Sequence, residues 1–213
     1  MNDTIATALR GGPATDAGEE ARRAAAAAER LEARIAEEGL ADVGYATVDS
    51  PFGTLHAAAT KRGLVRLAFP EEDEDTMLEA LARRLSPRIL ESPKMLDPVR
   101  RELDDYFAGR RRGFELPLDW SLVGPFGRRV LRVTADIPYG GSLSYAEVAA
   151  EAGSPRGSRA AGNALGSNPI PIVIPCHRVL RSGGALGGYG GGLDRKRWLL
   201  ELEGAIAPSL AGG

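Results

Sequence analysis

Cysteine and histidine are scarce in this chain of 213 residues, which has one cysteine and two histidines. A single cysteine excludes an internal disulfide. Three soft side chains are also too few to favour a dedicated zinc site, so we expect no bound metal. A chain without disulfides is typical of the reducing cytoplasm.

Long hydrophobic runs are also missing. No apolar stretch approaches the roughly 20 residues that a membrane-spanning helix needs. The opening residues, MNDTIATALRGG, lack the basic and apolar order of a secretory signal. With 43% hydrophobic and 26% charged residues, the composition is that of a globular protein of one or two domains. We expect a cytoplasmic protein without membrane contact.

The net charge of −2 does not by itself favour a nucleic-acid partner. Its distribution is uneven, because residues 125–198 contain ten basic and four acidic residues, a net charge of +6 that leaves −8 elsewhere. A basic half beside an acidic half indicates either a polyanion-binding surface or an ordinary solvated one.

The amino-terminal extension differs in composition from the rest. Residues 1–16 are small and polar, and we expect disorder there. Residues 17–38 are rich in alanine, glutamate and arginine and predict a helix, with Gly39 as its cap. Leu31 and Ile35 are its only large apolar residues, so we expect a docked or solvated helix without a function of its own.

Strand patterns begin at residue 43. The segments YATVDS, TLHAAAT and LVRLAF are short and apolar, and the turns between them predict an antiparallel meander. Helices are expected at residues 74–85 and 97–108, with Pro98 in the first turn of the second helix. Residues 88–91 are a candidate for a further strand.

The carboxy-terminal half has a helical pattern. In SYAEVAAEAG, Ser142 or Ser144 is suited to cap a helix, and Glu147 lies three residues after Ser144 as in a capping box. The turn GSPRG and a second helix, SRAAGNALGSN, complete a helix-turn-helix pattern. One side of the second helix is nearly bare, which indicates either tight helix packing or a nucleic-acid groove that Arg159 enters.

The only cysteine lies in the stretch PIVIPCHRV, directly before one of the two histidines. A lone cysteine is most often a small buried hydrophobic residue. As a nucleophile, Cys176 needs a base such as His177, and the base needs an orienting carboxylate. Glu203 is the better candidate for that carboxylate, because it ends the helix expected over RKRWLLELEG. Glu201, two residues earlier, points to another side of that helix.

These motifs resemble one family. NPIPIVIPCHRV and GGYGGGLDRKRWLLELEG closely resemble the O6-alkylguanine-DNA alkyltransferases, or methylated-DNA–protein-cysteine methyltransferases. The stretches SYAEVAAEAGSPRGSRAAGNALGSNP and SPFGTLHAAATKRGLVRLAF resemble the helix-turn-helix and the amino-terminal domain of the same family. The likeness covers about residues 42–205.

The resemblance implies an α/β (α+β) fold. A ribonuclease H-like domain with a three-stranded antiparallel sheet precedes a mainly helical, winged-helix-like domain. The parts expected along the chain are an extension, the first domain, a linker, the second domain and a tail: residues 1–41, 42–118, 119–124, 125–205 and 206–213.

The reaction that the resemblance implies is a direct, single-turnover repair without a cofactor. Cys176 takes the alkyl group from O6-alkylguanine, with O4-alkylthymine as an open second lesion. Glu203 orients His177, which draws the proton from the thiol. Tyr145 supplies a proton or hydrogen bond to the leaving guanine, and Lys196 favours the ionised thiol and phenol.

Further residues match the pocket of the family. Asn168 braces the turn before the cysteine. Backbone groups of Cys176 and Val179 read the guanine edge, and Tyr189 forms a wall. Several relatives have serine or alanine where this chain has Gly190, so we expect a roomier pocket that admits larger alkyl groups.

The implied partner is double-stranded DNA that carries the lesion. Arg159 is expected to fill the gap left by a flipped base. Ala160 and Gly162 let the helix approach the narrow minor groove, and Arg156 and Tyr145 are further expected DNA contacts. We expect a monomer and leave open whether copies cluster along DNA.

Three alternatives remain at this stage. A non-repairing sensor of alkylated DNA with the same fold would replace the cysteine, which this chain retains. A regulator that signals through its alkylated cysteine would need a further module, and the extension is short for that. A cysteine hydrolase would act on an ester or a peptide.

Overall fold

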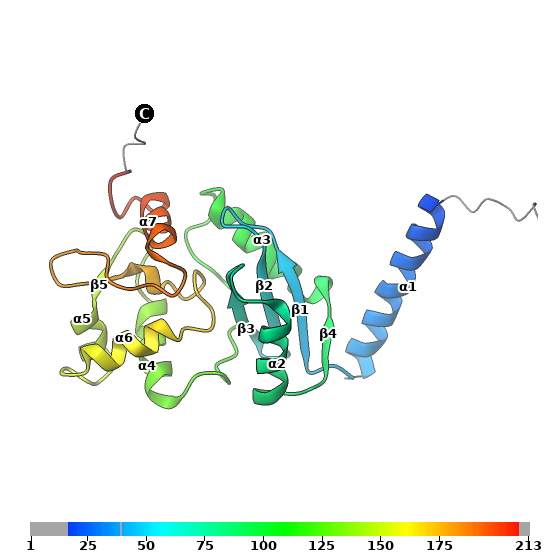
Figure 1. Ribbon diagram of the computed structural model, residues 1–213, viewed down its shortest axis with the longest axis horizontal. Helices are drawn as coiled ribbons and strands as arrows, with labels where there is room; N and C mark the ends of the chain where they lie inside the picture. Colours follow the sequence, from blue (N-terminus) through cyan, green and yellow to red (C-terminus); the bar gives the residue numbers. More distant parts are fainter. Residues whose placement is uncertain (1–16, 39, 209–213) are drawn as a thin grey trace, which may run out of the picture. The chain divides into compact units, whose positions relative to one another are not determined.

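The computed structural model describes residues 17–38 and 40–208 (Figure 1). The chain divides into two compact units, Met1–Ala41 and Asp42–Gly213. None of the described helices combines the length and apolar character that crossing a bilayer requires.

The first unit contains helix α1 (Ala17–Glu38), which confirms the predicted helix. Glu19 and Glu20 lie in its first turn, where the helix dipole favours acidic side chains. The predicted disorder of residues 1–16, the cap at Gly39 and the side chains of Leu31 and Ile35 lie outside the described residues.

The second unit begins with a sheet of four strands in the order β3-β2-β1-β4. Strands β1 (Val43–Val48), β2 (Leu55–Thr60) and β3 (Gly63–Ala68) form the predicted antiparallel meander. The candidate strand at residues 88–91 is confirmed as β4 (Ile89–Glu91), which pairs with β1 in parallel and adds a fourth strand to the antiparallel meander.

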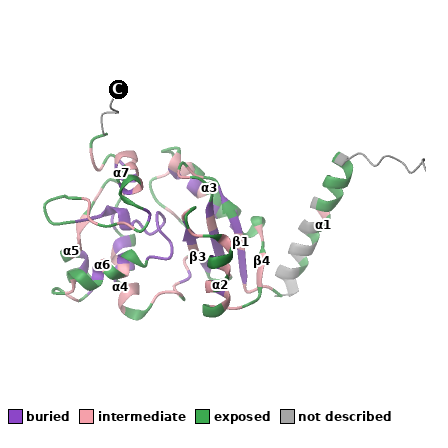
Figure 2. Ribbon diagram, viewed as in Figure 1, coloured by how far each residue is buried: buried purple, intermediate pink, exposed green. Residues whose placement is uncertain are grey.

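Two helices cover the two faces of this sheet. Alternate residues of β2 point to opposite sides: Ala58 shares a cluster with the buried residues of α2 (Glu74–Arg84), whereas Ala57 packs with those of α3 (Pro93–Phe107). The buried residues, purple in Figure 2, follow strands β1 to β3. The sheet is therefore buried between its helices.

The start of α3 corrects a prediction. The helix begins at Pro93 rather than near residue 97, so Pro98 lies inside it. Proline fits the first helical position because its missing N–H would have no partner there. From the sequence alone, each proline is suited to a first turn, and Pro93 is the one that opens the helix.

The described carboxy-terminal part contains four helices of more than one turn. They are α4 (Pro125–Ala135), α5 (Tyr145–Glu151), α6 (Ser158–Gly166) and α7 (Leu193–Leu202). The two of the predicted helix-turn-helix, α5 and α6, lie within a few residues of their expected bounds. The capping box at the start of α5 is confirmed: Ser144 accepts from the Glu147 N–H, and Glu147 accepts from the Ser144 N–H.

A short parallel ladder joins the segment before α5 to the segment after Cys176. Strand β5 (Leu143–Ser144) pairs with β6 (Val179–Leu180), which follows the 3₁₀ turn η1 (Cys176–Arg178). Parallel strands end at the same edge. Tyr145, directly after β5, therefore lies beside Arg181, directly after β6.

The described residues of the second unit share one large core across the predicted domain boundary. Leu55 and Tyr106 of the sheet part belong to the same cluster as Leu131 and Leu199 of the helical part. The N–H of Leu67 on β3 donates to the Pro169 carbonyl at 2.8 Å. The edge of the sheet is thus bonded to the turn that precedes the cysteine.

Candidate active site

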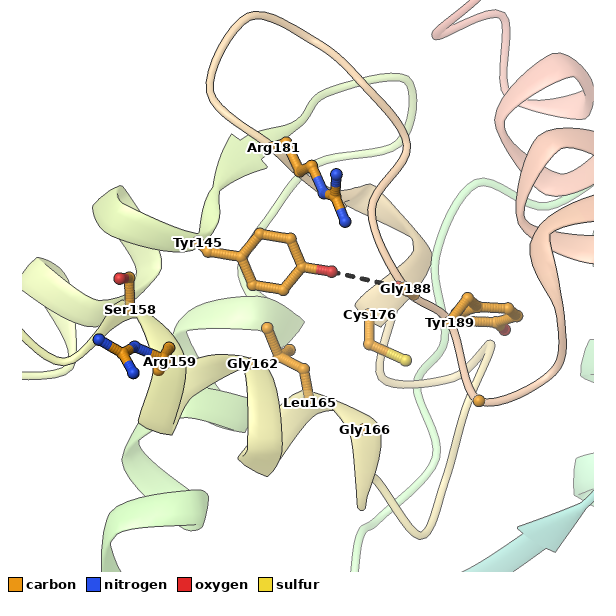
Figure 3. A pocket seen from close by; sticks show the side chains of 11 residues that line it. Tyr145, Ser158, Arg159, Gly162, Leu165, Gly166, Cys176, Arg181, Gly188 and Tyr189 are labelled. Atoms are coloured by element: carbon orange, nitrogen blue, oxygen red, sulfur yellow. Dashed lines mark hydrogen bonds between the residues drawn. The ribbon is translucent and has the colours of Figure 1, made fainter.

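A pocket of about 570 Å³ opens beside α6 and reaches the cysteine (Figure 3). Residues from three separate segments line it: α5 contributes Tyr145, α6 contributes Arg159, and the chain after η1 contributes Arg181 and Tyr189. Cys176 is buried, and its side chain points into this pocket. The single thiol therefore faces a cavity that the second helix of the helix-turn-helix helps to form.

The turn before the cysteine is buried and strained. Ile172 has a φ of 73°, a conformation that a β-branched residue rarely adopts. Asn168 holds this turn with its side chain: Oδ1 accepts from the Ile170 N–H at 3.0 Å, and Nδ2 donates to the Ile174 carbonyl at 2.9 Å. Strain of this kind persists where the surrounding contacts determine the conformation.

The thiol of Cys176 is neutral at rest. Burial raises its pKa, although a hydrogen bond from Asn168 Nδ2 at 3.2 Å and the nearby charge of Lys196 act in the opposite direction. A buried thiolate without full compensation is costly. The thiol therefore needs a base in order to react as a nucleophile at neutral pH.

His177 is the candidate base beside the thiol. Its Nε2 lies 3.0 Å from Glu203 Oε1, and burial lowers the pKa of the ring, so the imidazole is neutral. The carboxylate only accepts, which places the ring hydrogen on Nε2. Nδ1 is then a buried acceptor, and within the described part of the chain it has no hydrogen-bond partner.

Glu203 is an anion held by several donors. Burial would raise its pKa, but hydrogen bonds from His177 and Arg178 lower it to about 2. Arg178 reaches both carboxylate oxygens, at 2.9 and 2.8 Å, and Tyr106 donates to Oε1 at 2.7 Å. The bidentate arginine neutralises the charge of a carboxylate that is itself buried.

Lys196 is a buried cation between the strand that follows Cys176 and the glycine-rich loop. Its Nζ donates to the Val179 carbonyl at 2.6 Å and to the Gly188 carbonyl at 3.3 Å, and lies 5.9 Å from the centre of the Tyr145 ring. Burial lowers its pKa to about 8. The Tyr145 hydroxyl also donates to Gly188, at 3.1 Å, and burial raises the pKa of this phenol.

The glycine-rich loop after β6 supplies the outer wall. The ring of Tyr189 packs edge-on between His177 and Phe69, at 6.4 and 6.0 Å between centroids. A Cβ on Gly191 would lie 2.5 Å from the Phe69 ring, which requires glycine there. Gly190 lines the pocket beside Cys176 without such a restriction.

Comparison with known proteins decides the family. The model of the 6-O-methylguanine DNA methyltransferase ribonuclease-like domain matches residues 43–120, and that of the DNA binding domain of the same enzyme matches residues 125–205. The chain belongs to the 6-O-methylguanine DNA methyltransferase family.

Relatives of this methyltransferase family match along most of their length. The methylated-DNA–protein-cysteine methyltransferase of Mycolicibacterium paratuberculosis is 41% identical over 78% of this chain and 96% of its own. The constitutive protein of Bacillus subtilis is 38% identical over 75% of this chain and 94% of its own. The crystal structure of Mycobacterium tuberculosis OGT in complex with DNA is 40% identical, with a TM-score of 0.65 over 76% of this chain and 93% of that one.

The structure brings together most of the residues expected from the family likeness. Cys176, His177, Asn168, Lys196 and Glu203 form one buried cluster. The remaining predicted pocket residues lie at the cavity or beside it: Tyr145, Val179, Tyr189 and Gly190. On α6, Arg159 and Gly162 line the pocket and Ala160 is exposed, whereas Arg156 lies in the preceding turn and does not line it.

Three residues of the site were missed or misread from the sequence: Arg178, Arg181 and Tyr106. Arg178 was counted with a basic surface, but it is buried on Glu203. Lys196 was predicted in the site but also counted in the basic half, and it is buried as well. Arg181 lines the pocket mouth beside Tyr145. Tyr106 had no sequence signal, because 97 residues separate it from Glu203. The exposed charge of this half is therefore lower than the sequence count.

Proposed function

We propose that this protein repairs DNA directly, by moving the alkyl group of an O6-alkylguanine in duplex DNA onto Cys176 in a single turnover. One observation carries the proposal. The only thiol, with its buried histidine–glutamate pair, opens into a cavity that the helix-turn-helix itself lines.

The proposed chemistry begins with the thiol proton. It passes to Nδ1 of His177, directly or through one water, while Glu203 stabilises the imidazolium that forms. The sulfur attacks the alkyl carbon in line; the new S–C bond forms as the C–O6 bond breaks. The electron pair of that bond goes to the guanine, which receives a proton donated by Tyr145.

Lys196 supports both partners of this exchange. Its positive charge lies near Cys176 and under the Tyr145 ring, so it favours the thiolate and the developing phenolate. Once the proton held by His177 has returned through solvent to the Tyr145 phenolate, the net change is the exchange of the thiol hydrogen for the alkyl group, with unmodified guanine as the other product. Because the thioether is stable, each molecule acts once.

DNA is proposed to bind along α6. Arg159 and Arg181 flank the pocket mouth, and neither has an ion-pair partner among the described residues. We infer that Arg159 fills the space of the flipped base, and that Ala160, Gly162 and Arg156 lie along the minor groove. Binding to phosphates makes the affinity fall with salt.

The decisive test uses purified protein and duplex DNA that contains one O6-methylguanine. Intact-mass spectrometry should show a gain of about 14 Da, the exchange of hydrogen for methyl expected of covalent transfer, at most once per molecule and mapped to Cys176. The matched control is Cys176→Ser, which keeps the shape but removes the acceptor. An unchanged mass of reduced, folded protein that still binds the DNA would favour the sensor instead.

Two further alternatives are tested in the same preparation. Hydrolysis of an activated ester with repeated turnover would indicate a cysteine hydrolase. A transfer that increases binding to undamaged promoter-like DNA would add the regulatory function. The match of both parts of the chain to the 6-O-methylguanine DNA methyltransferase family supports repair over both.

A further inference from the structure

The carboxylate of Glu203 accepts a hydrogen bond from a residue outside the carboxy-terminal helical part of the protein. We propose that Tyr106, on helix α3 beside the amino-terminal sheet, is a positioning residue for the His177–Glu203 pair. The inference rests on the proposed function, because it assigns Tyr106 a part in activating the same thiol.

The two carboxylate oxygens are not equivalent. Oε1 accepts from the Tyr106 hydroxyl at 2.7 Å, from His177 Nε2 at 3.0 Å and from Arg178 Nη2 at 2.8 Å. Oε2 accepts from Arg178 Nε at 2.9 Å and from the Gly140 N–H at 3.4 Å. Tyr106 therefore competes with His177 for the same oxygen.

The phenol is a fixed and neutral donor. Tyr106 is fully buried, and burial together with the charge of Glu203 raises its pKa far above the ordinary value, so the hydroxyl keeps its proton. Its ring packs against Phe107, Phe114 and Tyr139, with centroids 5.1 to 6.2 Å away. A side chain held on several sides sets the direction of the carboxylate without adding charge.

Competition for Oε1 has a chemical consequence. Three donors share the negative charge of this oxygen, which weakens its pull on the ring hydrogen of His177. Removing the phenol hydroxyl leaves two donors, so the imidazole interacts with a stronger acceptor and its pKa rises. The carboxylate also loses one of the contacts that orient the ring. Both effects act through His177.

The test compares Tyr106→Phe with Tyr139→Phe in the full chain. Tyr139 belongs to the same aromatic cluster, but its hydroxyl donates to the Leu202 carbonyl, at 2.9 Å. The probe is free O6-benzylguanine, which reports attack by the thiol without DNA binding. The rate of benzyl transfer to Cys176 is followed by intact mass from pH 5 to pH 9.

We expect Tyr106→Phe to slow transfer at neutral pH about tenfold, the scale of one hydrogen bond to a charged group. The acid limb of its rate profile should move to higher pH, because a more basic His177 is protonated earlier. Tyr139→Phe should keep the profile of the parent. An unshifted limb in Tyr106→Phe, with or without a lower rate, would overturn the proposal, as would the same shift in Tyr139→Phe.

A double-variant cycle tests whether a loss of folding stability, rather than a loss of positioning, causes the slower transfer in Tyr106→Phe. In a Glu203→Gln background, Tyr106→Phe should add little further loss of rate, because the carboxylate through which it acts is gone. Independent, multiplying losses would mean that Tyr106 acts by another route. If the parent protein itself fails to take up the benzyl group, the proposed function fails, and this inference fails with it.

Discussion

The side-chain nitrogen of Asn168 donates to the sulfur of Cys176 at 3.2 Å and to the carbonyl oxygen of Ile174 at 2.9 Å. One amide thus holds the turn that presents the thiol and also touches the thiol itself. Because a donor stabilises the thiolate more than the thiol, this contact lowers the pKa of a cysteine that burial raises.

Replacement of this amide should therefore impair both reactivity and stability. Asn168→Ala leaves the Ile174 carbonyl and the Ile170 N–H without their partner, and we expect a loss of about 2 to 3 kcal/mol in the free energy of unfolding. Urea denaturation measures this loss, and intact mass measures the slower methyl transfer. Asn163→Ala, at an exposed position of α6, is the stability control and should change unfolding little. Equal losses in the two variants would contradict the bracing assignment.

Replacement of Arg159 should slow the reaction with duplex DNA but not the reaction with a free base. It is exposed at the start of α6 and lines the pocket mouth. Since flipping a base costs a few kcal/mol, Arg159→Ala should slow repair of O6-methylguanine in duplex DNA by at least about tenfold and leave the reaction with O6-benzylguanine unchanged. Equal slowing of both reactions would contradict the proposal that Arg159 fills the space of the flipped base.

Arg181 should contribute to DNA binding through charge. Arg181→Gln removes one cation from the pocket mouth, so the slope of log affinity against log salt should become shallower by about one unit. Fluorescence anisotropy with labelled duplex DNA at several salt concentrations measures this slope. The control is Arg101→Gln, an exposed position of α3 that does not line the pocket. A slope that is the same in both variants would contradict a contact between Arg181 and DNA.

Two neighbouring glycines should respond differently to alanine. A Cβ on Gly190 would meet only the Gly166 carbonyl oxygen, at 3.7 Å, whereas on Gly191 it would lie 2.5 Å from Phe69. Gly190→Ala should fold normally and lower the rate with O6-benzylguanine more than the rate with O6-methylguanine in DNA. Gly191→Ala should lose about 1 to 3 kcal/mol of stability by overpacking. An unchanged ratio of the two rates in Gly190→Ala would contradict a role in alkyl size.

Acid should destabilise the fold through Glu203. Its folded pKa of about 2 lies below the ordinary 4.5, so its stabilisation is complete above the unfolded pKa and is lost as the pH falls from about 4.5 toward 2. The loss amounts to at most about 3 kcal/mol. Urea denaturation between pH 7 and pH 3 measures it. In Glu203→Gln the free energy of unfolding should vary less over this range; an unchanged dependence would place the titrating group elsewhere.

Local patterns predicted much of the fold. Short apolar segments separated by turns marked β1 to β3 and the candidate strand that became β4, and Ser144 with Glu147 marked the start of α5, because these signals involve residues a few positions apart. The true start of α3 was less clear, because Pro98 suited the first turn of a helix that in fact begins at Pro93.

The site was predictable only where a contiguous motif contained it. Cys176 and His177 adjoin each other, and Glu203 ends the helix after the glycine-rich loop, so the family likeness located them. Arg178 was read as surface charge although it directly follows His177, because burial depends on packing that the motif does not describe.

The sequence by itself determined the candidate nucleophile of this protein and its family: a single thiol beside a histidine, in a motif that the family shares. Only the tertiary structure decided how that thiol is controlled. It places the Tyr106 hydroxyl on Glu203 across 97 residues of chain, neutralises Glu203 with Arg178, and leaves His177 Nδ1 without a hydrogen-bond partner among the described residues. Such long-range contacts arise when one core forms from both halves of the chain, and local sequence patterns do not contain them.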